Sequence, residues 1–177
     1  LMPALVARGG TELTTQAKAR LSAIADSNWS AKRSARRETT LTKFGATPIA
    51  NDWLMMQITN ALPADGVVVN EGLTSAWPLL DFLPYRDRWS YHANASGGIG
   101  WAIGAAIGVQ LAQPDRPLIA IIGDGSAMYS IQALWTAAHL NLPITYIIAN
   151  NKGYRILKQR LKAFHGNDNF IGMFIDE

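Results

Sequence analysis

Residues 117–154 constrain the fold of this chain more than any other stretch. They hold two apolar runs, at 118–122 and 144–149, which are rich in Ile and bounded by Pro or Gly. Such runs are typical of strands buried on both faces. The residues between them, 126–140, are numerous enough for one crossover helix. The stretch therefore predicts a β-α-β unit with parallel strands.

Polar residues follow both predicted strands. Asp124 stands in a GDG sequence after the first strand, and Asn151 closes an NN pair after the second, 27 positions later. Parallel strands deliver their carboxyl ends to one edge of the sheet, where open α/β sheets bind ligands. A carboxylate, an amide and a nearby backbone carbonyl supply part of a Mg²⁺ shell, which phosphate oxygens and water complete.

The residues around Asp124 suit a phosphate group. Gly123 and Gly125 allow a sharp turn and a close approach to a ligand. Ser126 opens a predicted helix whose free N–H groups favour an anion. We therefore expect a metal-bridged diphosphate at this edge. A plain β-α-β unit with an Asp-Gly turn is the simpler alternative, but GDG and NN at this spacing argue against it.

This pattern resembles a known family. GDG, an intervening helix and strand, and then NN are similar to the signature of thiamine-diphosphate-dependent enzymes. Within this family of 2-oxo acid decarboxylases and acetolactate synthases, the segment GDGSAMYSIQALWTAAHLNLP is most similar to the benzoylformate decarboxylases. The resemblance extends from about residue 47 to about residue 154. It implies a three-layer α/β/α fold with a mainly parallel sheet, which binds thiamine diphosphate through Mg²⁺.

The resemblance also implies roles for individual residues. The metal ligands would be the side chains of Asp124 and Asn151 and the backbone carbonyl of Gly153, which stands where the benzoylformate decarboxylases have a threonine. Further residues expected to bind the cofactor are Thr74, Gly97, Gly98, Ile99, Gly125, Ser126, Tyr129 and Tyr154. In the family, a glycine carbonyl equivalent to that of Gly97 holds the aminopyrimidine, and a side chain equivalent to Ile99 bends the cofactor.

Two segments depart from the family pattern. Gly72 and Leu73 replace hydroxyl residues in NEGLTS, so fewer side chains would reach the phosphate. Ile156 and Arg160 replace a small and an aromatic residue that help to line the family's substrate pocket. The 2-oxo acid substrate is therefore expected to be more polar or anionic than an aryl one.

No catalytic residue is expected within this chain. In the family, the glutamate that starts the reaction belongs to a pyrimidine-binding domain of a partner subunit, and no segment here matches that domain. Glu71 lies at the sheet edge but has the wrong context, and a glutamate there is ordinarily a solvated loop residue. We expect the chain to be inactive alone and to belong to a longer decarboxylase. An acetolactate synthase-type carboligase and a non-catalytic relative are the alternatives.

The N-terminal part differs in composition from the rest. Residues 1–45 hold eight Lys and Arg against three Asp and Glu. We expect a loop at 1–10, an amphipathic helix from Thr11, and a basic linker or exposed helix at 27–40. Because Trp29 is the one aromatic residue near the charges, a solvated face is favoured over a nucleic-acid patch. Residues 1–40 are predicted to end a preceding domain, and 41–177 to form a cofactor-binding domain truncated at its C-terminus.

Further elements follow from local signals. Thr47-Pro48 predicts a helix start, 67–69 and 89–93 predict strands, and 98–112 predicts a helix after Gly-Gly. A dinucleotide fingerprint at SGGIG fails, because Ile103 occupies the third glycine position. The helices expected at 98–112 and 126–140 are apolar nearly all round, which predicts burial on several sides and a homodimer or homotetramer.

The amino-acid composition limits the class of protein to which this chain can belong. The 177 residues are 49% hydrophobic and 16% charged, which fits a globular chain with a large core or interface. Cysteine is absent, so disulfides and thiolate metal sites are excluded. We expect no membrane span and no signal peptide, and hence a cytoplasmic protein.

Overall fold

The computed structural model describes residues 2–170, so the C-terminal apolar cluster at 171–175 lies outside the described residues. The chain divides into two compact units, residues 1–44 and 45–177. Among residues 2–170, no helix combines the length and the apolar character that crossing a membrane requires.

The first unit is helical. It contains α1 (Met2–Ala23), which is interrupted at Gly10 by non-helical backbone angles, and α2 (Trp29–Leu41). The loop predicted at 1–10 is therefore wrong, because the helix begins at Met2 and the glycines only kink it. Asn28 caps α2, and its side-chain oxygen accepts a hydrogen bond from the Ala31 amide at 2.9 Å.

The second unit is built on four parallel strands in the order β2-β1-β3-β4. Their bounds are β1 (Val67–Glu71), β2 (Tyr91–Ala93), β3 (Leu118–Gly123) and β4 (Ile144–Ala149). In the central register, Val69 pairs with Ala120, and Ala120 pairs with Tyr146. The parallel sheet predicted from the apolar runs is confirmed.

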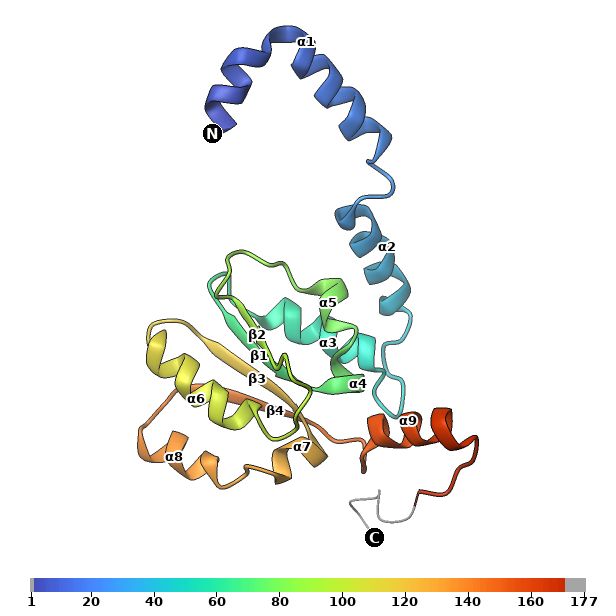
Figure 1. The fold of residues 1–177 in the computed structure, drawn as a ribbon, viewed down its shortest axis with the longest axis vertical. Helices are drawn as coiled ribbons and strands as arrows, with labels where there is room; N and C mark the ends of the chain where they lie inside the picture. Colours follow the sequence, from blue (N-terminus) through green and yellow to red (C-terminus); the bar gives the residue numbers. More distant parts are fainter. Residues whose placement is uncertain (1, 171–177) are drawn as a thin grey trace. The chain divides into compact units, whose positions relative to one another are not determined.

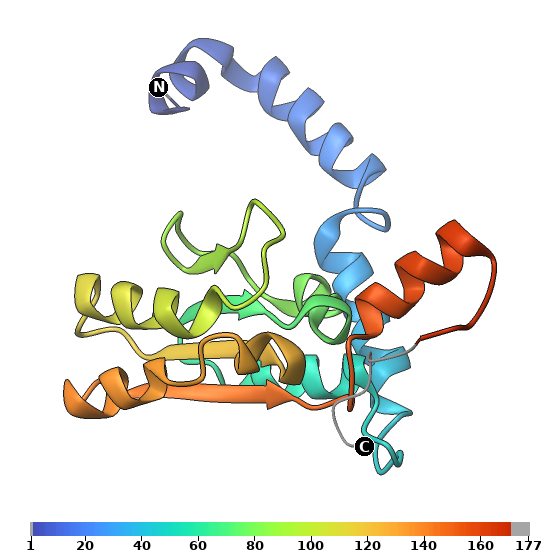
Figure 2. The same cartoon turned by 60° about the horizontal axis from the view of Figure 1, so that its bottom comes forward.

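Helices cover both faces of this sheet, as Figures 1 and 2 show. One core contains Val68 and Ile121 of the strands and buried side chains of α3 (Asn51–Ala61) and α5 (Leu79–Phe82). The other contains Val67, Val69 and Ile122 and buried side chains of α6 (Ala102–Ala112). Because successive strand residues point to opposite faces, one apolar run supplies both cores. The result is the expected three-layer α/β/α fold.

Three further short helices and one longer one complete the unit: α4 (Leu73–Ala76), α7 (Asp124–Met128), α8 (Ala133–His139) and α9 (Arg155–His165). The single crossover helix predicted at 126–140 is wrong. The chain turns between α7 and α8, where the amides of Ser130 and Ala133 bond to carbonyls three residues earlier. Within the single chain Trp135 of α8 is 69% exposed, so the burial on several sides that we expect from a homodimer or homotetramer stays a prediction.

Two predicted helix starts also shift. The helix expected at Thr47-Pro48 begins at Asn51, because Ala50 is extended and Asp52 supplies the acidic first turn. The helix expected from residue 98 begins at Ala102, because Gly97 and Gly100 have φ values of 75° and 93°. These left-handed conformations form a loop ahead of α6 and are incompatible with a right-handed helix.

Candidate functional site

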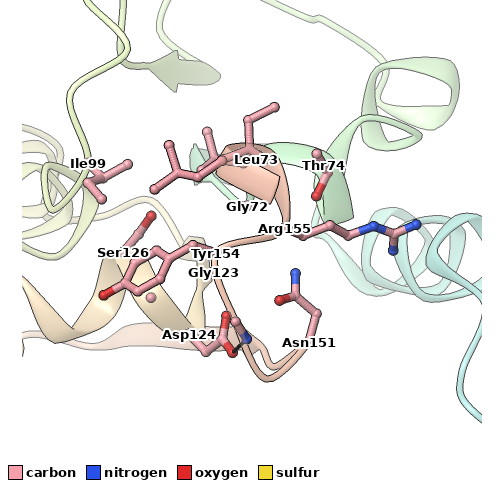
Figure 3. Close-up of a pocket in the computed structure, with 14 residues that line it drawn as sticks. Gly72, Leu73, Thr74, Ile99, Gly123, Asp124, Ser126, Asn151, Tyr154 and Arg155 are labelled. Carbon is pink, nitrogen blue, oxygen red and sulfur yellow. Dashed lines mark hydrogen bonds between the residues drawn. The ribbon is translucent and has the colours of Figure 1, made fainter. Parts of the chain in front are cut away.

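A cavity lies at the carboxyl ends of the strands, where the loops after β1, β3 and β4 meet (Figure 3). Its volume is about 40 Å³. Its lining comes from Gly72, Leu73, Thr74, Ile99, Gly123, Asp124, Gly125, Ser126, Asn151, Gly153, Tyr154, Arg155, Ile156 and Leu157. The topology thus brings together segments more than fifty residues apart, at the edge where α/β sheets bind ligands.

Asp124 directly follows β3 and is the first residue of α7. Its side chain is 9% exposed, and its Oδ2 accepts a hydrogen bond from the Gly153 amide at 3.2 Å. Its Oδ1 accepts none from the residues that the structure describes. The hydrogen bond ties the loop after β4 to the end of β3, and the remaining lone pairs are free for a cation.

Asn151 and Gly153 approach Asp124 from the loop after β4. The Asn151 Nδ2 donates to the Ser75 Oγ at 3.4 Å, and Figure 3 shows the carboxamide oxygen turned toward Asp124. The Gly153 carbonyl accepts a hydrogen bond from the Arg155 amide at 2.9 Å, which leaves one of its two lone pairs. The three predicted metal ligands therefore lie together at one site.

Two hydroxyl groups on the same cavity have no partner. Thr74 of α4 is 8% exposed and Ser126 of α7 is 4% exposed, and both line the cavity. Neither hydroxyl forms a hydrogen bond with any described residue. Neither hydroxyl oxygen is among the fully buried atoms that lack a partner, so both remain accessible from the cavity. Two unpaired donors beside Asp124 therefore suit a ligand that carries acceptor oxygens.

Gly125 and Tyr154 are placed against each other. A Cβ atom added to Gly125 would lie 2.6 Å from the Cε1 atom of the Tyr154 ring. Only glycine permits this approach, so the GDG turn and the start of α9 fit together at the cavity wall. Both residues line the cavity, and their contact with a cofactor stays a prediction.

The remaining predicted residues are distributed differently. Ile99 lines this cavity, whereas Gly97 and Gly98 line a neighbouring one of about 200 Å³. Tyr129 lines neither, and its side chain is 59% exposed. Ile156 lines the cavity with Asp124, but Arg160 does not.

Two residues of the lining, Arg155 and Leu157, were not predicted from the sequence. Leu73, which replaces a hydroxyl residue of the family, also lines the cavity and begins α4. Its φ of 44° is uncommon for leucine. Arg155 and Leu157 belong to α9, whose first turn faces the cavity because Tyr154 packs on Gly125.

The interpretation of Glu71 as a solvated loop residue is wrong. Its side chain is 4% exposed, and its two carboxylate oxygens accept hydrogen bonds from the amides of Gly100 and Ala102, each at 2.6 Å. The residue ends β1 inside the domain and bonds the loop ahead of α6. The sequence around Glu71 gives no sign of this burial, because its hydrogen-bond partners lie about 30 residues later in the chain.

The residues present fit a cation with a phosphate group. No cluster of three His, Cys, Asp or Glu side chains occurs within residues 2–170, so a transition-metal cage is not formed there. One carboxylate, one amide and one carbonyl are instead hard oxygen donors suited to Mg²⁺ with phosphate and water. The cavity of about 40 Å³ has room for a few water-sized groups, since one water needs about 10–15 Å³.

Fold and site together define a class: an open parallel α/β domain with a cavity at the carboxyl ends of its strands, lined by Asp124, Asn151 and Gly153. Residues 73–173 match the family described as thiamine pyrophosphate enzyme, C-terminal TPP binding domain. The chain belongs to this family. Thiamine pyrophosphate is the same compound as thiamine diphosphate.

Individual relatives agree with this assignment. The chain is 43% identical over 96 residues to benzoylformate decarboxylase of Pseudomonas aeruginosa, covering 54% of this chain and 18% of that protein. It is 32% identical over 109 residues to the acetolactate synthase large subunit of Porphyra purpurea, covering 61% and 18%. The solved structure of a thiamine diphosphate-dependent 4-hydroxybenzoylformate decarboxylase from Rhodococcus jostii RHA1 matches with a TM-score of 0.68 and 35% identity, covering 73% and 24%. The chain thus spans about a fifth of the length of these relatives.

Proposed function

We propose that this chain is the diphosphate-binding domain of a thiamine-diphosphate-dependent 2-oxo acid decarboxylase, similar to the benzoylformate decarboxylases, and that it binds the diphosphate through Mg²⁺. One observation carries the proposal. Asp124, which follows β3, meets Asn151 and Gly153 of the loop after β4 in one cavity, beside the unpaired hydroxyls of Thr74 and Ser126. Metal-bridged phosphate binding requires this combination of donors.

Each residue then has a defined task. Asp124, Asn151 and the Gly153 carbonyl hold Mg²⁺, while Thr74 and Ser126 donate hydrogen bonds to phosphate oxygens. Ile99, on the opposite wall, supports the cofactor beyond its diphosphate by shape. When bound, thiamine diphosphate supplies the carbanion stabilisation on which loss of CO₂ from a 2-oxo acid depends. The protein supplies binding, orientation and exclusion of water.

Further domains complete this proposal. The 40 Å³ cavity holds only one end of the cofactor, so we place the other end against a pyrimidine-binding domain that this chain does not contain. Residues 1–40 then lead from a preceding domain, and residues 41–177 form the diphosphate-binding domain. The full-length protein is a homodimer or homotetramer in this proposal, and the chain by itself is inactive.

Calorimetric titration tests the binding step. Thiamine diphosphate is titrated into the full-length protein with Mg²⁺ and again with EDTA. We expect saturable binding only with Mg²⁺, because the site contains a carboxylate and, apart from Arg155, no positive side chain in its lining. Equal affinity in EDTA would refute the metal-bridged site, and no binding in either condition would favour a non-catalytic relative.

An acetolactate synthase-type carboligase is the second candidate, and the cavity lining favours it in one respect. Leu73, Ile156 and Leu157 are aliphatic. Tyr154, the one aromatic residue among the described residues of the lining, packs against Gly125. Benzoylformate, pyruvate and glyoxylate supplied to the holoenzyme separate the two functions. Release of CO₂ and a free aldehyde indicates a decarboxylase, whereas release of CO₂ with a coupled hydroxy-keto product indicates a carboligase.

A further inference from the structure

Glu71 is a buried carboxylate whose only described partners are backbone amides. It ends β1 and is 4% exposed. Its Oε1 accepts a hydrogen bond from the Gly100 amide and its Oε2 from the Ala102 amide, each at 2.6 Å, and no ion pair joins it to any described residue. Burying a carboxylate without a cation is costly unless its hydrogen bonds compensate. Glu71 must therefore act on the surrounding structure through its hydrogen bonds with these two amides.

Those amides belong to the loop that carries Ile99 into the cofactor cavity. On one side of Ile99, the Asn94 Nδ2 donates to the Gly98 carbonyl, and the Asn94 Oδ1 accepts from Ser96. On the other side, Glu71 holds the next residue, Gly100, which also packs against Tyr129: an added Cβ at Gly100 would lie 2.5 Å from the Tyr129 Cβ. The loop is thus fixed at both ends.

Glu71 links this loop to the metal-binding edge through the sheet. In the register of β1 and β3, Glu71 pairs with Ile122, and Asp124 follows two residues later. The backbone of Glu71 is therefore fixed relative to Asp124, and its side chain transfers that position to the residues flanking Ile99. One carboxylate connects the two walls of the cavity.

We propose that Glu71 is a positioning residue, which sets the place of Ile99 relative to Asp124 and thereby orients the part of the cofactor beyond the diphosphate. The inference rests on the proposed function. It differs from a merely structural role, in which Glu71 would stabilise the start of α6 without affecting the bound cofactor. The two readings give different results for the same variants.

The first experiment uses Glu71→Gln in the full-length protein. The carboxamide keeps one acceptor oxygen but turns an N–H₂ donor toward an amide donor, so one of the two hydrogen bonds is lost. Hydrogen exchange of the peptide covering residues 96–103 is measured with and without thiamine diphosphate and Mg²⁺. Wild type should gain protection of this peptide with cofactor. The variant should lose most of that gain, while the cofactor Kd from calorimetry changes less than about threefold, because Asp124 and Asn151 are intact.

Gln110→Ala is the matched control. Gln110 is a buried polar residue of α6, the helix whose first residue bonds to Glu71. At the C-terminal end of this helix, its Nε2 donates at 3.2 Å to the carbonyls of Gln113, Pro114 and Arg116. This variant should lower Tm while cofactor still protects residues 96–103. If Glu71→Gln does not fold, Glu71→Asp takes its place, since the shorter side chain keeps the charge but cannot reach both amides.

A double-mutant cycle on turnover completes the test. Glu71→Gln should lower kcat by about tenfold or more, as expected for displaced groups at a site. Combined with Ile99→Ala, it should add little, because both changes remove the same support. Additive effects, or cofactor protection of residues 96–103 equal to wild type, would overturn the role of Glu71. Failure of wild type to bind the cofactor would instead refute the proposed function.

Discussion

At the scale of single residues, the site depends on groups that satisfy each other only in part. One carboxylate oxygen of Asp124 accepts a hydrogen bond from the Gly153 amide, and the other accepts none from the described residues. The side-chain nitrogen of Asn151 donates to Ser75, and its side-chain oxygen has no such partner. The hydroxyls of Thr74 and Ser126 are unpaired among the described residues. These unpaired donors and acceptors lie together in one cavity lining, which makes them available to a ligand that carries both a cation and acceptor oxygens.

Asp124→Ala should abolish metal-dependent cofactor binding. The change removes the one carboxylate in the cavity lining, so the affinity for thiamine diphosphate with Mg²⁺ should fall by more than about 100-fold, since even outer-shell partners of metal ligands are worth about 10- to 100-fold. Calorimetry on the full-length protein measures this. Asp115→Ala, at an exposed position away from the cavity, is the control and should bind normally. Unchanged binding in Asp124→Ala would exclude this residue as a metal ligand.

Ile99 should act by shape. Ile99→Leu and Ile99→Met should retain most activity, because their volumes are similar. Ile99→Ala should lower kcat by about 10- to 100-fold through misplacement of the cofactor, with the cofactor Kd changed less than about threefold. Steady-state kinetics and calorimetry supply the two numbers. The reverse pattern, weak binding with normal kcat, would identify Ile99 as an ordinary binding or core residue.

Gly125→Ala should damage the site through sterics alone. The added methyl group would lie 2.6 Å from the Tyr154 ring, so either the ring or the GDG turn must move. We expect weaker cofactor binding and a lower Tm. Gly125→Ala combined with Tyr154→Leu should recover part of the loss, because a smaller, flexible side chain leaves room for the methyl group. No recovery would place the strain in the turn itself.

At the scale of elements, α6 is fastened at both ends by buried polar side chains. Glu71 holds its first residues, and Gln110 holds the turn that leads to β3. Between them one face of the helix is buried, through Ala102, Ile103, Ala106 and Ile107. Apolar packing gives the helix its stability, whereas the two polar residues fix its ends along the sheet.

Gln110→Ala should destabilise the domain without changing the cofactor site. The change removes the buried amide that the carbonyls of Gln113, Pro114 and Arg116 share as a donor, which costs on the order of 1–3 kcal/mol. Urea unfolding should show a lower midpoint with an unchanged m-value. Gln113→Ala, whose side chain accepts a single hydrogen bond from Arg116, is a milder control. A stability equal to wild type would mean that water replaces Gln110 freely.

At the scale of the whole molecule, the second unit leaves apolar side chains uncovered on α7, α8 and α6. Exposed fractions are 58% for Met128, 69% for Trp135 and 56% for Leu111. These three side chains lie outside the two core clusters that pack against the sheet. Large exposed apolar side chains of this kind are candidates for contact with another protein surface.

We expect the chain to associate with itself through this surface. Light scattering at micromolar concentration should give a mass above the 19.3 kDa of one chain. Trp135→Glu should shift the population toward the monomer without unfolding it, since the ring is exposed and stacks only on His139, at a centroid distance of 4.8 Å. Phe164→Glu, on α9, is the control. A wild-type monomer at all concentrations would contradict the prediction.

The sequence alone determined the β-α-β unit, the parallel sheet and the meeting of Asp124 with Asn151. Short apolar runs bounded by Pro or Gly are local signals for buried strands, and a connection of this length between them implies parallel strands whose following loops share one edge. The apolar runs at 118–122 and 144–149 therefore predicted β3 and β4 correctly.

Only the tertiary structure decided the break between α7 and α8, the start of α6 and the burial of Glu71. The length of a helix depends on what it packs against, and residues 126–140 carry no strong breaker. The start of α6 depends on two left-handed glycines, and local sequence permits but does not require that conformation. Glu71 is buried because two amides from residues 29 and 31 positions later reach its carboxylate, and contacts at that separation leave no local pattern.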